Sequence, residues 1–226
     1  MNIQRFSRET ISSLLSAALL FLFIIGISAC SDDDDETQVE TFGEGSVGTP
    51  VDLGLSVRWA SWNIGGNAPA DYGKYFQWGA TSESEPFADI LGLAISATEH
   101  DAARVIWGGS WRMPTSTEFL ELLDPKKCSW SWTSKVNSNG NTIYGYLITS
   151  LIDGYAGNSI FLPASGEAGW SIKMGSVGFL WSGSMATRID SKGTTVAYGL
   201  DFLENNFSIG SNTLERRFPI RPVMDR

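Results

Sequence analysis

The chain is poor in the residues that most catalytic and metal sites need. It has one histidine, His100, and two cysteines, Cys30 and Cys128. A Ser–His–Asp set would depend on that single histidine, and no cluster of His and Cys suited to zinc is present. Paired carboxylates could act together, but nothing in the sequence singles out a pair. We therefore predict no enzyme activity, no metal site and no cofactor.

Basic residues are also few. The chain has 16 Lys and Arg against 25 Asp and Glu, a formal net charge of −9. Proteins that bind nucleic acid neutralise phosphates with Lys and Arg, and proteins that dock on anionic lipid use a basic patch. The charge balance therefore predicts no nucleic-acid partner and no electrostatic docking on a membrane.

Only one long run is apolar and free of charge, and it covers residues 11–29. It follows Arg5 and Arg8 and ends in the small residues of a secretory signal. Residues 27–30, ISAC, resemble a bacterial lipobox, in which the cysteine is diacylated and becomes the mature N-terminus. The alternative is an uncleaved signal anchor, because such a run could just span a bilayer. We expect a lipoprotein signal peptide over residues 1–29, with the lipid on Cys30.

The segment after Cys30 is acidic. Residues 31–35, SDDDD, resemble the tag that sends Bacteroidetes lipoproteins to the outside of the outer membrane. The alternative is a plain acidic tether, because like charges repel and keep a segment extended. We expect residues 30–48 to be a flexible tether and the protein to be lipid-anchored in the outer membrane, facing the exterior.

A lipid on Cys30 would leave Cys128 without a partner for a disulfide bond. Cys128 is close in sequence to Trp130 and Trp132, which suits a small buried apolar residue. A catalytic thiol would need an activating base nearby. We expect Cys128 to be buried and unreactive.

Residues 49–226 contain all nine tryptophans and no long break, which predicts a single domain. Two helices are expected early. Thr98 could cap a short one, and Thr115 with Glu118 forms the capping box of a second, which Asp124-Pro125 would end.

Most of the other segments read as strands. Alternation or aromatic content predicts them at 55–60, 72–79, 143–149, 159–163, 178–181, 196–203, 207–209 and 218–223, with a hairpin turn at 137–141. Two helices with many short strands predict an α+β fold.

Six sequence blocks occur in an order that resembles a known family. They are VDLGLSVRWA at 51–60, DYGKYFQWG at 71–79, WGGSWRMPT at 107–115, NSIFLPA at 158–164, WSGS at 181–184 and RFPIRPV at 217–223. Together they resemble the major paralogous domain family first named from Fibrobacter and abundant in Bacteroidetes lipoproteins. That family is similar to the C-type-lectin-like fold, shared with formylglycine-generating enzymes. The resemblance implies two short helices, a small twisted, mostly antiparallel sheet and long loops.

The resemblance also carries expectations for single residues. Trp107, Trp111, Trp181 and Arg221 lie in the recurring blocks, and we expect them in the core rather than as sugar platforms. Trp62 stands where the family often has a cysteine facing the region of residue 128. The tripeptides EPF at 85–87 and WNI at 62–64 depart from those of lectins that bind sugar through calcium, which argues against calcium-dependent binding.

Three function classes follow. The first is a non-enzymatic surface module that binds a glycan, a peptide or a host or bacterial surface protein through its C-terminal loops. The expected ligand-binding residues are polar groups on those loops: Arg188, Asp190, Asn205, Asn206, Asn212 and Arg216. The second class is a structural subunit of a surface assembly. The third is an enzyme related to formylglycine-generating enzymes, for which Cys128 alone cannot supply the paired cysteines.

Overall fold

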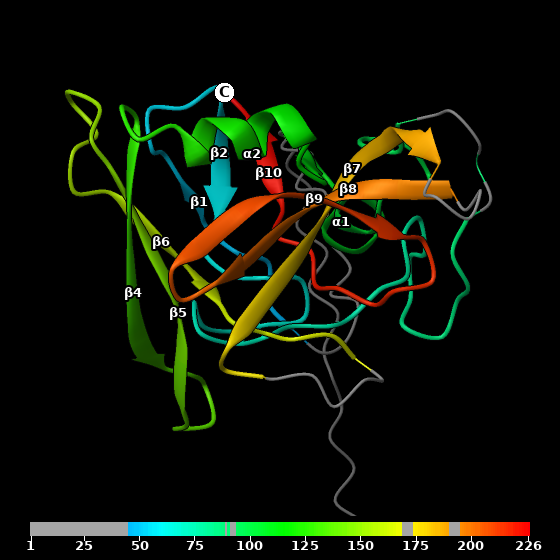
Figure 1. Cartoon of the computed structure of the whole chain (residues 1–226), viewed down its shortest axis with the longest axis horizontal. Helices are drawn as coiled ribbons and strands as arrows, with labels where there is room; N and C mark the ends of the chain where they lie inside the picture. The colour runs from blue at the N-terminus through cyan, green and yellow to red at the C-terminus, as the bar shows by residue number, and fades with distance from the viewer. Residues whose placement is uncertain (1–44, 89, 91–93, 169–173, 190–194) are drawn as a thin grey trace, which may run out of the picture. The chain divides into compact units, whose positions relative to one another are not determined.

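The protein is described by a computed structural model that covers residues 45–88, 90, 94–168, 174–189 and 195–226 (Figure 1). The expected signal peptide, Cys30 and most of the tether lie outside these residues. The described residues belong to one compact unit. No helix among the described residues is long and apolar enough to cross a membrane.

The described residues form three antiparallel sheets and two short helices. The sheets have the strand orders β1-β2-β10-β3, β4-β5-β6 and β7-β8-β9. In chain order the elements are β1 (Pro50–Val51), β2 (Val57–Ala60), α1 (Ala102–Trp107), β3 (Trp111–Arg112), α2 (Ser116–Leu123), β4 (Cys128–Val136), β5 (Thr142–Ser150), β6 (Ser159–Pro163), β7 (Val177–Ile189), β8 (Thr195–Leu203), β9 (Asn206–Thr213) and β10 (Val223–Asp225).

The expected α+β, C-type-lectin-like fold is wrong, because the domain is β-rich. The helices have only six and eight residues, too few to cover a sheet. The sheets instead cover one another. One core cluster combines β2, α2, β4, β5, β6 and β8, and in it Tyr146 of β5 packs edge-on against Phe202 of β8 with ring centroids 5.8 Å apart.

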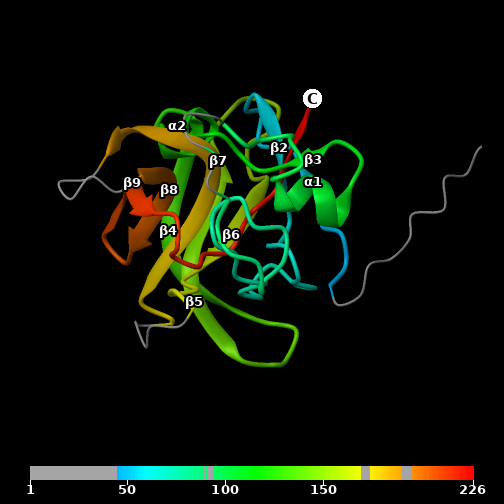
Figure 2. The same ribbon diagram turned by 90° about the vertical axis from the view of Figure 1, so that its right-hand side faces the viewer.

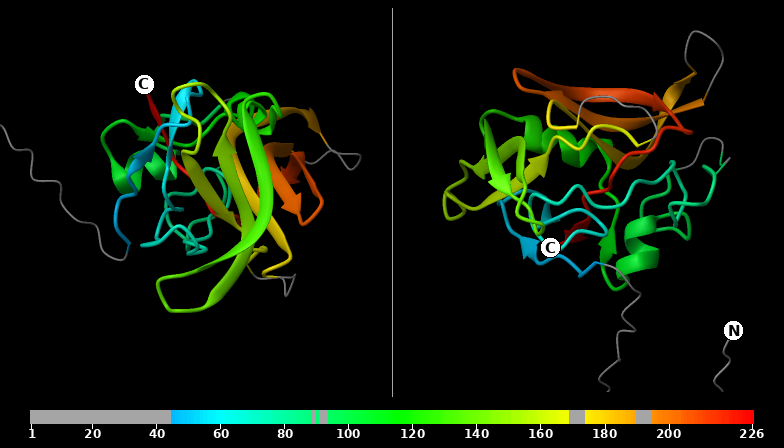
Figure 3. Two further views of the ribbon diagram at one scale, coloured as in Figure 1. Left: turned by 90° about the vertical axis from the view of Figure 1, so that its left-hand side faces the viewer. Right: turned by 90° about the horizontal axis from the view of Figure 1, so that it is seen from below.

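The first sheet brings the two ends of the described chain together. Val223 of β10 pairs with Trp59 on one side and with Arg112 on the other. Trp59 is fully buried and stacks on Phe119 of α2 at 5.4 Å. Figure 2 shows α1 and this sheet on the opposite side of the domain from β7, β8 and β9, and Figure 3 shows the β4–β5 hairpin extending beyond the rest of the domain.

The two helix starts differ in how well local sequence predicts them. The capping box of α2 is confirmed: the Thr115 hydroxyl accepts from the Glu118 N–H, and the Glu118 carboxylate accepts from the Thr115 N–H. The expected Thr98 cap of α1 is wrong. Asp101 caps α1 instead, because its carboxylate reaches the N–H groups of Ala103 and Arg104.

The strand expected at 72–79 is also wrong. Its only bridge joins Phe76 to Phe218, and its other backbone bonds go singly to loops, for example from Lys74 N–H to Ile64. Of the strand expected at 218–223, only Val223 belongs to one. Phe76 and Trp78 are buried in a core cluster that includes Trp181 of β7, although their own segment forms no strand. Aromatic content here therefore indicates burial and does not indicate a strand.

The expected core positions are confirmed. Trp107 and Trp111 are 6% and 5% exposed, and Trp181 and Arg221 are fully buried. The Arg221 guanidinium donates to Asn63 and to the carbonyls of Ala60 and Phe161, and burial lowers its pKa to about 9. These residues hold the core together and are closed to a ligand.

Cys128 is 2% exposed and forms no disulfide within the described residues. Burial raises the pKa of its thiol to about 11, so it is protonated at neutral pH. The thiol is therefore a core group.

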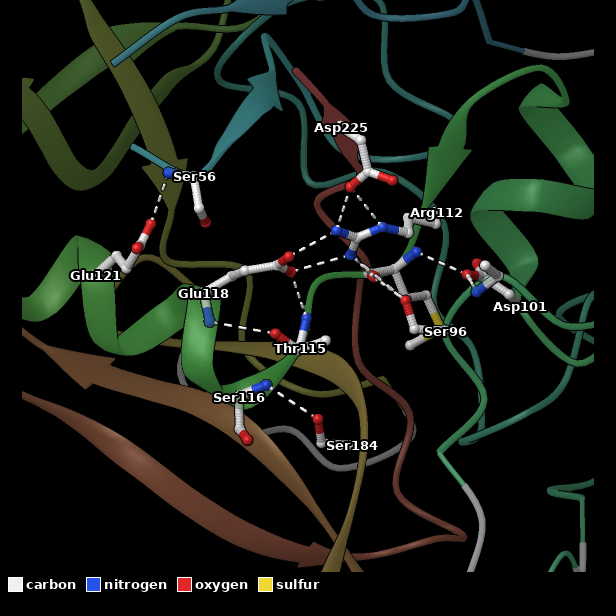
Figure 4. A network of polar contacts seen from close by, with 12 residues as sticks. Ser56, Ser96, Asp101, Arg112, Thr115, Ser116, Glu118, Glu121, Ser184 and Asp225 are labelled. Carbon is white, nitrogen blue, oxygen red and sulfur yellow. Dashed lines mark hydrogen bonds and ion pairs between the residues drawn. The ribbon is translucent and has the colours of Figure 1, made fainter. Parts of the chain in front are cut away.

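A polar clamp fixes α2 to the C-terminal strand (Figure 4). Arg112 lies between Glu118 and Asp225, with an N···O distance of 2.6 Å to each. Nearby, the Asp101 carboxylate also accepts from the backbone N–H of Met113 and Ala97. Because Arg112, Glu118 and Asp101 each have several internal partners, the clamp is a structural feature.

Candidate functional site

The predicted ligand-binding residues that the structure describes lie near the two ends of β9. Asn205 and Asn206 are exposed at the turn that joins β8 to β9. Asn212 lies near the other end of β9. Arg188 belongs to β7, but its side chain lies outside the described part, and Asp190 lies outside the described residues altogether.

Arg216 is held by internal contacts. Its guanidinium donates to both oxygens of Glu167, at 3.0 and 2.6 Å, and to the side-chain oxygen of Asn212 at 2.5 Å. It also lies over the rings of Phe179 and Phe218, about 5 Å from each centroid. Asn212 is only 5% exposed. Ligand contact by Asn212 and Arg216 stays a prediction, and this geometry disfavours it.

Asp201 adjoins this network and lies in a slot made by glycines. Its carboxylate accepts from the Asn212 amide at 3.1 Å, and a side chain at Gly210 would collide with it. Burial raises the pKa of Asp201 to about 6, although the Asn212 hydrogen bond and the charge of Arg216 lower it. Asp201 therefore titrates close to neutral pH.

A pocket that could take a ligand lies between the β4–β5 hairpin and the β8–β9 turn. It has a volume of about 310 Å³ and is lined by Trp132, Tyr144, Gly175, Ser176 and Glu204. We call it the hairpin–turn pocket. Its size is at the lower end of the range for small-molecule sites.

The hairpin supplies the aromatic wall of the pocket. In the β4–β5 ladder Trp132 pairs with Tyr146 and Ser134 pairs with Tyr144, so Trp132 and Tyr144 are diagonal neighbours on one face. The turn at 137–141 sets this register, since the Asn137 side chain accepts from two backbone N–H groups within it. The turn expected at these residues is confirmed.

Tyr146 joins the wall to the β8–β9 turn. It packs edge-on against Trp132, with ring centroids 5.0 Å apart, and its hydroxyl donates to the Leu203 carbonyl at 3.2 Å. Burial raises the pKa of Tyr146, and the charge of Glu204 raises it further. Tyr146 therefore holds Glu204, the residue after Leu203, next to the aromatic wall.

Backbone hydrogen bonds join the segment after β6 to β5 and to the segment at the start of β7. Ala164 N–H donates to the Tyr144 carbonyl, Gly175 N–H donates to the Ala164 carbonyl, and Gly166 N–H donates to the Val177 carbonyl. Gly175 has φ of 85°, a conformation that favours glycine, and no atom lies within 4 Å of the position a Cβ would occupy. The pocket therefore stays open at Gly175.

Four polar groups of the pocket have no internal partner. Within the described residues, the Trp132 indole N–H, the Tyr144 and Ser176 hydroxyls and the Glu204 carboxylate make no hydrogen bond. The neighbouring Trp130 differs, because its indole N–H donates to the Leu122 carbonyl at 2.7 Å. Both indoles pack against the core, but only the Trp132 N–H is left as a donor for a ligand.

Exposed apolar side chains surround the same place. Tyr144 is 50% exposed. Met174 and Leu203, which directly precede the lining residues Gly175 and Glu204, are 59% and 47% exposed. Val136, on the same face of the hairpin as Trp132, is 63% exposed. A group of exposed apolar residues beside a pocket is typical of a binding surface.

Sequence reasoning missed Trp132, Tyr144 and Glu204. One signal was present: residues 130, 132, 144 and 146 flank the turn symmetrically, so they share a face that reaches the exposed end of the hairpin. Glu204 directly precedes Asn205 and Asn206, which we predicted to bind ligand, but its place beside Tyr144 depends on contacts far apart in sequence.

Among the described residues, no group of three or more His, Cys, Asp and Glu is arranged to hold a metal ion. Comparison of the chain with protein-family models, with curated proteins and with solved structures found no match.

Proposed function

We propose that this protein is a lipid-anchored surface protein whose folded part binds a ligand in the hairpin–turn pocket without transforming it. The observation that supports this function is the combination of two aromatic side chains with four polar groups that lack internal partners. Trp132 is half-buried, whereas Tyr144, Ser176 and Glu204 are exposed, so all four polar groups lie where a ligand could reach them. Groups left free around a pocket are available to a ligand.

The anchoring part of the proposal rests on the sequence. The ISAC segment ending at Cys30 and the acidic residues after it are the features of an exported lipoprotein. The ordered blocks between residues 51 and 223 support a relationship to the major paralogous family of Bacteroidetes. A tethered binding module at the cell surface agrees with both.

Binding is a better reading of the pocket than catalysis. Its described lining contains one carboxylate, on Glu204, and no histidine, lysine or cysteine. A nucleophile or general base in an enzyme is normally activated by a second group within hydrogen-bond reach. Glu204 has no such partner among the lining residues.

The test uses full-length protein in detergent on arrays of glycans and peptides. Wild-type protein should give signals that Tyr144→Ala abolishes, since this change removes half of the aromatic wall. Leu120→Ala is the matched control, because Leu120 is 56% exposed on α2 and does not line the pocket. Retention of every signal by Tyr144→Ala would refute the proposed site.

A further inference from the structure

We infer that the ligand of the hairpin–turn pocket is a neutral saccharide, an inference that rests on the proposed function and adds the ligand class. A pyranose ring presents C–H groups on its faces and hydroxyls around its edge. The faces of Trp and Tyr rings carry negative charge density and attract such C–H groups. Trp132 and Tyr144 lie together on one wall and provide this surface.

The free polar groups match hydroxyls, which both donate and accept. The Glu204 carboxylate only accepts, the Trp132 indole N–H only donates, and the Ser176 hydroxyl does both. Hydrogen bonds from hydroxyls to a carboxylate are among the stronger ones. A ligand with several hydroxyls can pair with all three groups at once.

The charge of the pocket selects against acidic sugars. Glu204 carries the only full charge among the described lining residues, and its effect on the pKa of Tyr146 places that charge near the aromatic wall. A uronate or sialate carboxylate in the pocket would lie close to this like charge with no described basic residue to offset it. A neutral ring meets no such repulsion.

A cationic ligand is the main competitor, because aromatic rings and a carboxylate also attract quaternary ammonium groups. Such a group has no hydrogen-bond acceptor, so the Trp132 N–H and the Ser176 hydroxyl would gain nothing from it. The saccharide uses every free group of the pocket. The donor and acceptor set therefore favours the saccharide.

The experiment measures dissociation constants for full-length protein in detergent. The probes are neutral glucose, galactose and N-acetylglucosamine oligomers, oligogalacturonate as the acidic match, and choline chloride. At least one neutral oligomer should bind, and oligogalacturonate should bind at least about tenfold more weakly than its neutral galactose match, a factor equal to about 1.4 kcal/mol. In Glu204→Gln the dissociation constants for oligogalacturonate and for the galactose oligomer should differ by at most about threefold. The substitution removes the charge of the side chain and keeps its size. Glu215 is exposed and lies outside the pocket lining, so Glu215→Gln should change neither of these two dissociation constants.

The outcomes separate this inference from the proposed function. Binding of choline or of a peptide that depends on Tyr144, with no neutral oligomer bound, would overturn the saccharide and keep the site. Stronger binding of the uronate than of the neutral sugar would also overturn it. Saccharide binding that survives both Tyr144→Ala and Trp132→Phe would refute the site itself.

Discussion

Replacing Asp201 with asparagine should make the domain more stable at neutral pH. The Asp201 carboxylate lies across Gly210 with one side-chain partner, Asn212, and burial raises its pKa from 3.8 to about 6. The folded state therefore holds a proton on Asp201 more tightly than the unfolded chain does. Its favourable contribution is complete below about pH 4 and is lost as the pH rises through 6.

The size of the effect follows from the two pKa values. The difference between 3.8 and about 6 corresponds to about 3 kcal/mol at 1.36 kcal/mol per unit, as an upper limit. Asparagine is neutral at every pH and its oxygen can still accept from Asn212. The stability difference between Asp201→Asn and wild type should therefore grow by about 2 kcal/mol between pH 4.5 and pH 7.5.

Denaturant unfolding at several pH values and constant ionic strength measures this difference directly. Subtracting the wild-type curve removes the contributions of the other carboxyl groups. Asp153→Asn, at an exposed turn, is the matched control, and its stability difference from wild type should not change with pH. If the stability difference between Asp201→Asn and wild type stays constant or falls as the pH rises, the Asp201 carboxylate is not desolvated in the folded protein.

Three further changes test other parts of the structure. Arg112→Met should cost about 3 kcal/mol in a denaturant melt, because it leaves Glu118 buried without its partner; an unchanged midpoint would contradict the clamp. Thr115→Ala should cost about 1 kcal/mol through the lost cap, whereas Ser116→Ala should stay within about 0.5 kcal/mol; equal costs would argue against the capping box. Cys30→Ala should abolish metabolic labelling with a clickable fatty acid, and unchanged labelling would refute the lipoprotein assignment.

Local signals predicted local structure well. The Thr115 capping box involves groups within four residues of one another, so the sequence contains all of it. The turn at 137–141 is also local, because the Asn137 side chain accepts hydrogen bonds from backbone N–H groups of the same turn. At the start of α1 we expected Thr98 as the cap, whereas Asp101 is the cap and also accepts from the Met113 N–H, a contact that the sequence does not reveal.

The fold class depended on information the sequence reading did not contain. Most strands between residues 128 and 213 were expected, but their grouping into two separate sheets depends on pairings between distant segments. The same limit applies to the site. Asn212 and Arg216 look like loop residues, yet Glu167, some fifty residues earlier in the chain, binds Arg216 and holds it inward.

Ligand contact at Trp132 tests the central claim most directly. The indole N–H groups of the nine tryptophans give separate signals in a nitrogen–proton correlation spectrum, and Trp132→Phe assigns one of them. On addition of the bound oligosaccharide, the Trp132 signal should shift most, because its N–H is free to meet the ligand. The Trp130 signal should move little, since that N–H is already bonded to Leu122. A Trp132 signal that stays in place while other indole signals shift would contradict the account.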